Sequence, residues 1–320
     1  MVAEPRLTCL IQLATVWVWR VQCTQSPEWG QDMTRAVGRG VVTGAPRGIG
    51  REIALSLGCA GYAVEAMMRT TGDSDLVEIA FHENLLTTVS DLDVDNDASV
   101  ARFFGVVAAA SEPSDVLVNN AGILSIDAIE DETIAYMQAI MNTNFFGAVR
   151  CMKAVLPAMR ARGHGTIVNI LSISGRMTPF AQGAYAASKH ALEAAGEALA
   201  QELAPFDVRV AMVEPGIIAS DMAIDNLPSP RADSAYPHGR RMLAFYADTP
   251  ASRTPPIVVA QTVLDIVGGQ VTTFRSLCGP DAVAFVGMRP GLTDEAWIAM
   301  SDTLDDAVYF GRFGAAMPTA

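Results

Sequence analysis

Short runs of β-branched and other apolar residues alternate with longer stretches of helical character from about Gly38 onward. Between the apolar runs, Asp97–Ala110, Thr133–Arg162 and Tyr185–Ala204 have the length and apolar spacing of helices. This alternation is typical of βαβ units, which build a parallel sheet covered by helices on both faces. The chain is therefore predicted to belong to the α/β class. The apolar runs are VVTGA, AVEAMM, LLTTVSDL, DVLVNNAG, GTIVNIL and DVRVAMVEPG.

No internal repeat or low-complexity linker interrupts the series, so we expect one domain over residues 33–320. The segment Ile217–Thr254 is rich in Pro, Asp, Ser and Arg and has little periodicity. Connections of this length are usually lids or binding loops. After it, Pro256–Val267 is expected to be a helix and Val271–Leu277 a final strand, with a helical or irregular tail from Thr293.

Residues 1–32 are expected to form an N-terminal extension that is not part of the fold. Leu7–Cys23 is apolar but short for a membrane span, and it contains a glutamine and an arginine. Glu4 and the lack of a small-x-small cleavage site disfavour a signal peptide. A membrane anchor is the alternative, but folding is expected to begin near Met33, where MTRAVGRGVVTGA runs into the first strand.

Charge and cysteine content narrow the classes of partner. With 35 acidic and 22 basic residues the formal net charge is −13, which disfavours nucleic acids and anionic membranes, because both bind basic patches. The five cysteines and four histidines are scattered, without the spacing of a metal site. We therefore expect no metal, no nucleic-acid or membrane partner, reduced cysteines and a cytoplasmic protein.

The first βα turn has the composition of a phosphate-binding loop. VVTGAPRGIG places three glycines between a strand and the helical run REIALSLGCA. Glycine permits a tight turn and lets the backbone approach a pyrophosphate, whose charge is stabilised by free N–H groups at the start of the helix. A structural turn is the alternative for a glycine cluster alone, but this position in the series favours a dinucleotide site. The residues expected to contact the cofactor here are Gly44, Pro46, Arg47, Gly48, Ile49 and Gly50.

The spacing TGxxxGIG resembles the opening motif of the short-chain dehydrogenase/reductase family. The resemblance covers roughly residues 38–220 and is diffuse beyond them. It implies a nicotinamide-dependent oxidoreductase built as a single doubly wound Rossmann domain, with a parallel sheet of about seven strands and helices on both faces. The later family motifs follow in order as Asn119–Gly122 (NNAG), Asn144–Gly147 (NxxG), Ser172, Tyr185-x-x-x-Lys189 and Pro215-Gly216.

Two arginines favour NADP(H) as the cofactor, with NAD(H) still possible. Met68 ends the run AVEAMM at the position where NAD-binding family members carry an acid, and Arg69 follows it. Arg47 adds a cation at the other place where NADP-binding members have one, and a 2′-phosphate needs positive charge. Surface charge is the alternative for either arginine alone, and Glu65 should point elsewhere. By resemblance, the cofactor site also includes Asp93, Asn119 (for which a structural role is equally open), Ala121, Gly122, Tyr185, Lys189, Pro215, Gly216, Ile217, Ile218 and Ser220.

A Tyr-x-x-x-Lys pair supplies the candidate acid/base. Tyr185 and Lys189 lie four residues apart in a helical segment, so they share one face. The ammonium is expected to lower the phenol pKa from its usual value of about 10 and to make the pair a general acid/base. Lys153 is the only other lysine among the 22 basic residues, and a compact ammonium can hold a ribose hydroxyl where the guanidinium fork cannot. An exposed Tyr and Lys without function is the alternative for this motif alone.

Ser172 and Asn144 complete the expected site. Ser172 follows GTIVNIL at the carboxyl edge of a strand, thirteen residues before Tyr185, where a hydroxyl can hydrogen-bond the substrate oxygen as charge develops. Ser174 is the neighbouring competitor. By resemblance, Asn144 holds a water against the lysine. From the sequence alone, it could equally bend a long helix.

The expected reaction is the interconversion of an alcohol and a ketone or aldehyde by hydride transfer, with Tyr185 as the general acid/base. Enoyl reductases and sugar epimerases of the same fold are rivals, and so is a non-catalytic nucleotide sensor or scaffold. The Tyr-x-x-x-Lys spacing and the retained Ser, Tyr and Lys weigh against them. Assembly as a homodimer or homotetramer is expected through the helices of Thr133–Arg162 and Gly183–Ala204. A lipophilic small-molecule substrate is favoured by apolar residues that could equally be core contacts: Met222, Leu227, Met242, Leu243, Phe245 and Tyr246.

Overall fold

The structure is a computed structural model, in which the N-terminal extension and Leu7–Cys23 lie outside the described residues. Part of the segment 217–254, including Leu227, also lies outside them. Within the described ranges, no helix is both long enough and apolar enough to span a membrane. The described residues are 36–69, 74–109, 113–220, 222, 229–248 and 253–316.

A sheet of seven parallel strands forms the centre of the fold, in the order β3-β2-β1-β4-β5-β6-β7. Adjacent strands are parallel because helical connections return the chain to the same edge of the sheet. The order reverses between β1 and β4, and open α/β sheets bind ligands beside the carboxyl ends of strands at such a point. The predicted doubly wound sheet is confirmed. Its strands are β1 (Arg39–Thr43), β2 (Ala63–Met68), β3 (Thr87–Asp91), β4 (Val116–Asn119), β5 (Gly165–Ile170), β6 (Val208–Pro215) and β7 (Arg275–Cys278).

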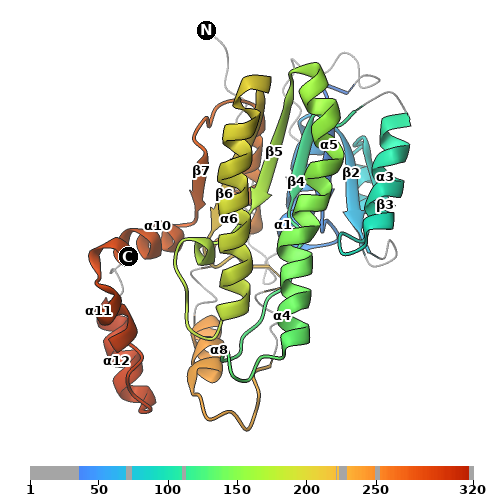
Figure 1. Ribbon diagram of the computed structural model, residues 1–320. Coiled ribbons are helices and arrows are strands. Elements are labelled where there is room, and N and C mark those ends of the chain that lie inside the picture. The colour runs from blue at the N-terminus through green and yellow to red at the C-terminus, as the bar shows by residue number, and fades with distance from the viewer. Residues whose placement is uncertain are drawn as a thin grey trace.

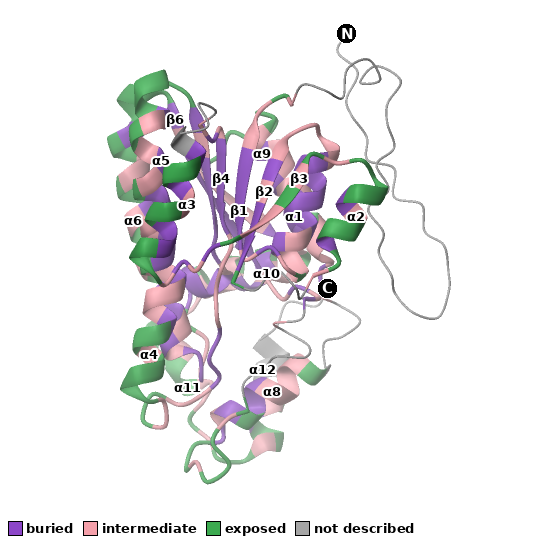
Figure 2. Cartoon of the chain, turned by 90° about the vertical axis from the view of Figure 1, so that its right-hand side faces the viewer, coloured by how far each residue is buried: buried purple, intermediate pink, exposed green. Residues whose placement is uncertain are grey.

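Each face of the sheet carries its own hydrophobic core. Successive side chains of a strand point to opposite faces, so Val42 and Val118 pack into one core while Val41 and Leu117 pack into the other. Figure 2 shows the sheet between two helical layers. One layer consists of α1 (Gly48–Cys59), α2 (Leu76–His82) and α9 (Pro256–Val267), and the other of α3 (Asp97–Ala109), α5 (Ala148–Arg162) and α6 (Gly183–Leu203).

Further helices lie beyond the carboxyl ends of the strands, below the sheet in Figure 1. One of them falls inside Ile217–Thr254, which showed little periodicity in the sequence. The last strand begins later than predicted, because the backbone N–H of Val271 donates to the carbonyl of Asp265 at the end of α9. The helices are α4 (Ile134–Met141), α8 (His238–Asp248), α10 (Pro280–Met288), α11 (Asp294–Ala299) and α12 (Asp306–Ala316).

The state of the cysteines differs in part from the expectation that they are reduced. Cys151 and Cys278 are free and buried, and burial raises the pKa of Cys151 to about 12. Cys59, at the end of α1, is disulfide-bonded, so the prediction of reduced cysteines is wrong for that residue.

Candidate active site

The turn that follows β1 and the first turn of α1 each have a position where the backbone favours glycine. Gly44 has a φ of +65°, and a Cβ there would lie 2.7 Å from the Cα of Ala121. A Cβ on Gly50 would lie 2.3 Å from the carbonyl oxygen of Gly44. The amide of Asn120 donates to the carbonyls of Thr43 and Gly44, at 3.0 and 2.9 Å. The turn is therefore held against the end of β4.

A cavity of about 350 Å³ adjoins this turn and the start of α1. The N-cap residue, Arg47, makes no side-chain capping hydrogen bond, and the first turn of α1 carries no acidic residue. The positive end of the helix dipole is therefore available to an anionic group. The expected cofactor residues that line this cavity are Gly44, Pro46, Arg47, Gly48, Ile49, Gly50, Arg69, Ala121, Gly122, Tyr185, Lys189 and Ser220.

Two expected cofactor residues do not line either of the cavities described for this site. The Asn119 amide donates to the Asn169 side-chain oxygen at 2.8 Å, between two neighbouring strands. Asp93 accepts from the backbone N–H of Asp95, and Asp95 lines the smaller cavity in its place. The remaining expected cofactor residues, Pro215, Gly216, Ile217 and Ile218, line a second, larger cavity.

Two arginines line the smaller cavity. Arg47 and Arg69 are exposed and both line it, while Met68 is buried at the end of β2. Glu65 faces away, where its carboxylate accepts from Arg39 at 3.3 Å and from the Thr88 hydroxyl at 2.8 Å. Two guanidinium groups beside a cavity with a glycine-rich turn suit a nucleotide that carries an additional phosphate.

Tyr185 and Lys189 lie on one face of α6, and Ser172 caps a short turn after β5. Ser172 and Tyr185 line the same cavity, and the Ser172 hydroxyl favours ionisation of the phenol. The Lys189 ammonium donates to the carbonyl of Ile170 at 3.0 Å and lies 5.7 Å from the Tyr185 ring centroid. The competitor, Ser174, donates instead to the side-chain oxygen of Gln182 at 3.4 Å. The serine, tyrosine and lysine thus meet at the carboxyl edge of the sheet.

Burial controls the ionisation of this pair. It raises the pKa of the Tyr185 phenol, and the neighbouring Ser172 hydroxyl opposes that effect. It lowers the pKa of Lys189 to about 8. The expectation that the phenol pKa would be lowered is therefore wrong for the protein alone, since desolvation outweighs the effect of Ser172 and Tyr246 adds to the rise.

Asn144 lies in a π-helical turn, η1 (Asn142–Gly147), which joins α4 to α5. Its amide donates to the carbonyl of Ile123 at 2.9 Å and to the Ser188 hydroxyl at 3.0 Å, and its oxygen accepts from the Ile123 N–H at 2.8 Å. The Ser188 hydroxyl in turn donates to the carbonyl of Tyr185 at 2.7 Å. Asn144 therefore ties the loop after β4 to the start of α6.

The second cavity has a volume of about 470 Å³ and adjoins the first, because Tyr185 lines both. Ser172 also lines it. From the segment 217–254, four of the apolar candidates reach it, whereas Leu243 packs in the cluster behind it. The four are Met222, Met242, Phe245 and Tyr246.

Sequence reasoning missed three groups in this region. Asn120 holds the glycine turn, and only its place in the NNAG motif could have pointed to it. The Gln182 amide donates to the Tyr246 hydroxyl at 3.1 Å inside the larger cavity. Trp297 and Tyr309, from the C-terminal helices, also line that cavity. Nothing in the local sequence indicates the last two groups, because their positions depend on contacts between distant segments.

The sequence profile of the short chain dehydrogenase family matches residues 40–230. The chain belongs to the short-chain dehydrogenase/reductase family. As an oxidoreductase of this family, it resembles human retinol dehydrogenase 8, with 37% identity over 251 residues that cover 75% of this chain and 78% of that protein.

Two solved structures show the same fold. A short-chain dehydrogenase from Streptomyces avermitilis has a TM-score of 0.71 and 29% identity, over 84% of this chain and 100% of that one. A metagenomic short-chain oxidoreductase in complex with NADP has a TM-score of 0.61 and 27% identity, over 76% of this chain and 96% of that one.

Proposed function

We propose that the protein is an NADP(H)-dependent oxidoreductase that interconverts an alcohol and a ketone or aldehyde, with Tyr185 as the general acid/base. One observation carries the proposal. Tyr185 lines both the cavity beside the glycine turn and the larger, mainly apolar cavity, and Ser172 lines the larger cavity with it. A nucleotide in the first cavity and a carbonyl compound in the second would both reach this point.

The residues of the site have distinct roles in this proposal. When bound, the nicotinamide supplies or accepts the hydride. Tyr185 donates a proton to the carbonyl oxygen during reduction, and its raised pKa keeps the phenol protonated at neutral pH. Ser172 hydrogen-bonds the same oxygen as negative charge develops on it. Lys189 holds a ribose hydroxyl, and Asn144 keeps the water path to that lysine in place.

The preference for NADP(H) rests on Arg47 and Arg69. Both line the smaller cavity, and a 2′-phosphate between two guanidinium groups would gain charge-assisted hydrogen bonds. The related metagenomic oxidoreductase was solved with NADP, which supports the same cofactor.

A lipophilic substrate is supported by the lining of the larger cavity. Met242, Phe245 and Trp297 contribute apolar surface to it, and about 470 Å³ is enough for a bulky ligand. Human retinol dehydrogenase 8, by its name, acts on a lipophilic alcohol.

Cofactor binding is the first test. NADPH and NADH are titrated separately into the wild type, Arg47→Ala/Arg69→Ala and the control Arg160→Ala, and nicotinamide fluorescence is recorded. The wild type and the control should bind NADPH selectively, and the double variant should lose at least about tenfold in NADPH affinity with little change for NADH. Equal affinities for both nucleotides in the wild type would contradict the NADP assignment.

Catalysis is tested next with Tyr185→Phe in a screen of apolar ketones. Loss of NADPH oxidation with unchanged NADPH binding would support the acid/base role. A wild type that binds NADPH but reduces no carbonyl compound would favour a non-catalytic nucleotide sensor on the same fold.

A further inference from the structure

The outer wall of the larger cavity comes from the last part of the chain. We call residues 292–312, which carry α11 and most of α12, the C-terminal segment. Trp297, Met300, Ser301 and Tyr309 of this segment line the cavity. Figures 1 and 2 show α11 and α12 beyond the carboxyl edge of the sheet, in neither of the two helical layers. The position of the C-terminal segment at the cavity therefore depends on its contacts with neighbouring elements.

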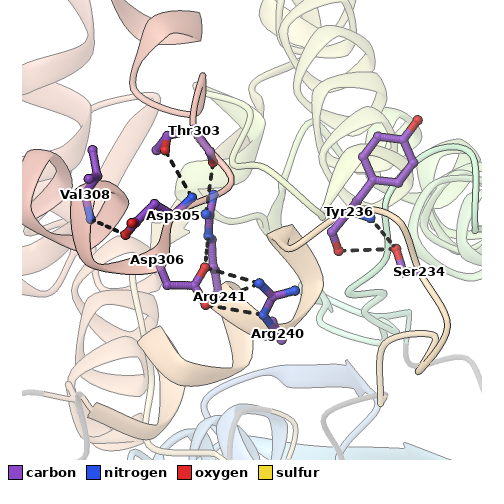
Figure 3. A network of polar contacts seen from close by, with 8 residues as sticks. All are labelled: Ser234, Tyr236, Arg240, Arg241, Thr303, Asp305, Asp306 and Val308. Atoms are coloured by element: carbon purple, nitrogen blue, oxygen red, sulfur yellow. Dashed lines mark hydrogen bonds and ion pairs between the residues drawn. The ribbon is translucent and has the colours of Figure 1, made fainter.

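A buried arginine of α8, Arg241, binds the C-terminal segment. The Arg241 side chain has no exposed surface. Its Nε donates to the Asp306 carboxylate at 2.8 Å, and its Nη2 donates to the carbonyl of Thr303 at 3.0 Å, as Figure 3 shows. The guanidinium carbon also lies 4.3 Å from the Tyr309 ring centroid. A buried cation is costly unless it is paired, and all three of these contacts come from the C-terminal segment.

The segment is ordered around this contact by its own hydrogen bonds. Asp305 accepts from the Val308 N–H at 3.1 Å and donates its own N–H to the Thr303 hydroxyl at 3.1 Å (Figure 3). These bonds cap the start of α12. At the other end of the segment, the Arg289 guanidinium lies 5.5 Å from the Trp297 ring centroid. Arg241 therefore contacts a turn, at the start of α12, that is also held by its own hydrogen bonds.

Residues next to Arg241 and its partners also line the cavity. Met242 follows Arg241 directly, and Phe245 lies one helical turn further on; both line the cavity. The Tyr309 ring packs edge-to-face against Phe180, at 5.4 Å between centroids, and both of these rings line the cavity too. Displacement of Tyr309 would therefore remove one side of the apolar lining.

We propose that Arg241 is a positioning residue for substrate selection: it fixes the C-terminal segment as the outer wall of the cavity and so favours bulky apolar substrates over small ones. This inference rests on the proposed function. A bulky substrate gains affinity by burying apolar surface against Trp297 and Tyr309. A small carbonyl compound needs only the groups around Ser172 and Tyr185.

Arg241→Met tests the proposal, because methionine keeps an apolar stem and removes the guanidinium. Arg240→Met is the matched control: Arg240 contacts the same Asp306 carboxylate, at 3.3 Å, but its side chain is 60% exposed, so its ion pair contributes little. NADPH-dependent reduction of cyclohexanone and of a four-ring steroid ketone is measured for each variant. Hydrogen exchange of the amides of residues 292–312 is followed in the NADPH-loaded proteins.

Arg241→Met should raise the KM for the steroid ketone by about tenfold or more, with kcat and the cyclohexanone KM little changed. It should also speed exchange in the C-terminal segment, and Arg240→Met should do neither. Unchanged exchange, or faster exchange with the same loss for both ketones, overturns the proposal. Asp306→Asn is the second variant: if Arg241→Met fails to fold, Asp306→Asn must still shift the ratio of the two KM values, and an unshifted ratio overturns the proposal.

If the wild type binds NADPH and reduces neither ketone, the proposed function fails, and the proposal about selection fails with it. The comparison of hydrogen exchange between the variants still reports separately whether Arg241 holds the C-terminal segment in place.

Discussion

Lys189 is a single residue in which the requirements of stability and activity conflict. Its ammonium is buried, and the carbonyl of Ile170 is its hydrogen-bond acceptor. Burial lowers its pKa from an ordinary 10.5 to about 8. The folded state therefore holds this proton less tightly than the unfolded chain does, and keeping the residue charged at neutral pH lowers the free energy of unfolding.

The resulting dependence on pH has a definite sign. Between about pH 8 and pH 10.5 the unfolded chain binds more protons at Lys189 than the folded protein does. The contribution of Lys189 to the free energy of unfolding should therefore rise with pH across this window, by roughly 3 kcal/mol in total. Urea unfolding of the wild type and Lys189→Met at a series of pH values isolates this contribution as the difference between two curves. Parallel curves would mean that the lysine is not perturbed as described.

Ser172 and Ser174 allow a comparison between two hydroxyl groups that line the same cavity. The Ser172 hydroxyl favours ionisation of the Tyr185 phenol, whereas Ser174 donates to Gln182. We expect Ser172→Ala to lower kcat by about 100-fold or more, because a donor to the developing oxyanion is lost, and Ser174→Ala to have a much smaller effect. Steady-state kinetics with saturating NADPH measures both. A larger loss in Ser174→Ala would reverse the assignment.

Among the elements, the β1–α1 turn tolerates the least change. An alanine Cβ at Gly50 would lie 2.3 Å from the Gly44 carbonyl oxygen and 2.4 Å from the Asn120 amide nitrogen, so the backbone must shift. Gly50→Ala should lower the free energy of unfolding by about 2 kcal/mol or more and weaken NADPH binding. Equilibrium unfolding in urea and nicotinamide fluorescence are the two measurements.

Gly105 is the matched control on α3. Apart from the neighbouring backbone of its own helix, no atom lies within 4 Å of the position of its added Cβ, and the residue is exposed inside the helix. Gly105→Ala should therefore raise the free energy of unfolding by about 0.5–1 kcal/mol. A loss of stability in both variants would mean that neither effect comes from the local space described.

At the scale of the whole molecule, one face, formed by α4 and the π-helical turn that continues into α5, carries exposed apolar side chains. Ile134 is 68% exposed and Phe146 is 48% exposed. Exposed apolar residues grouped on one surface are typical of an interface between subunits. We propose that the protein assembles as a homodimer or homotetramer through this face together with α6.

Sedimentation velocity tests the assembly. Ile134→Asp/Phe146→Asp should shift the wild-type oligomer toward monomer, because carboxylates at a packed interface would lose hydration without gaining partners. Phe81→Asp is the control, since Phe81 is 81% exposed on α2, in the opposite helical layer. A wild type that sediments only as monomer would refute the proposal.

The amino-acid sequence by itself determined most of the elements and the arrangement of the sheet between helical layers. Val41 and Val42 face opposite cores because strand side chains alternate, and the continuous apolar runs of the sequence predict strands that are buried on both faces. The predicted helix Pro256–Val267 matches α9, because its length and apolar spacing are local properties. The glycine turn and the Tyr-x-x-x-Lys pair were found in the same way, since their chemistry depends on residues that are close in sequence.

Only the tertiary structure decided the features that depend on burial and on distant contacts. The pKa of Tyr185 is raised because the folded chain desolvates the phenol, whereas neighbouring residues had predicted the opposite direction. Asn120 holds the glycine turn and Asn119 bonds Asn169, a difference set by which side of β4 each side chain faces. Arg241 has no exposed surface because the C-terminal segment folds over it, with the contact to Thr303 spanning 62 residues of sequence. No local pattern encodes such contacts, since they arise when separate segments meet around a cavity.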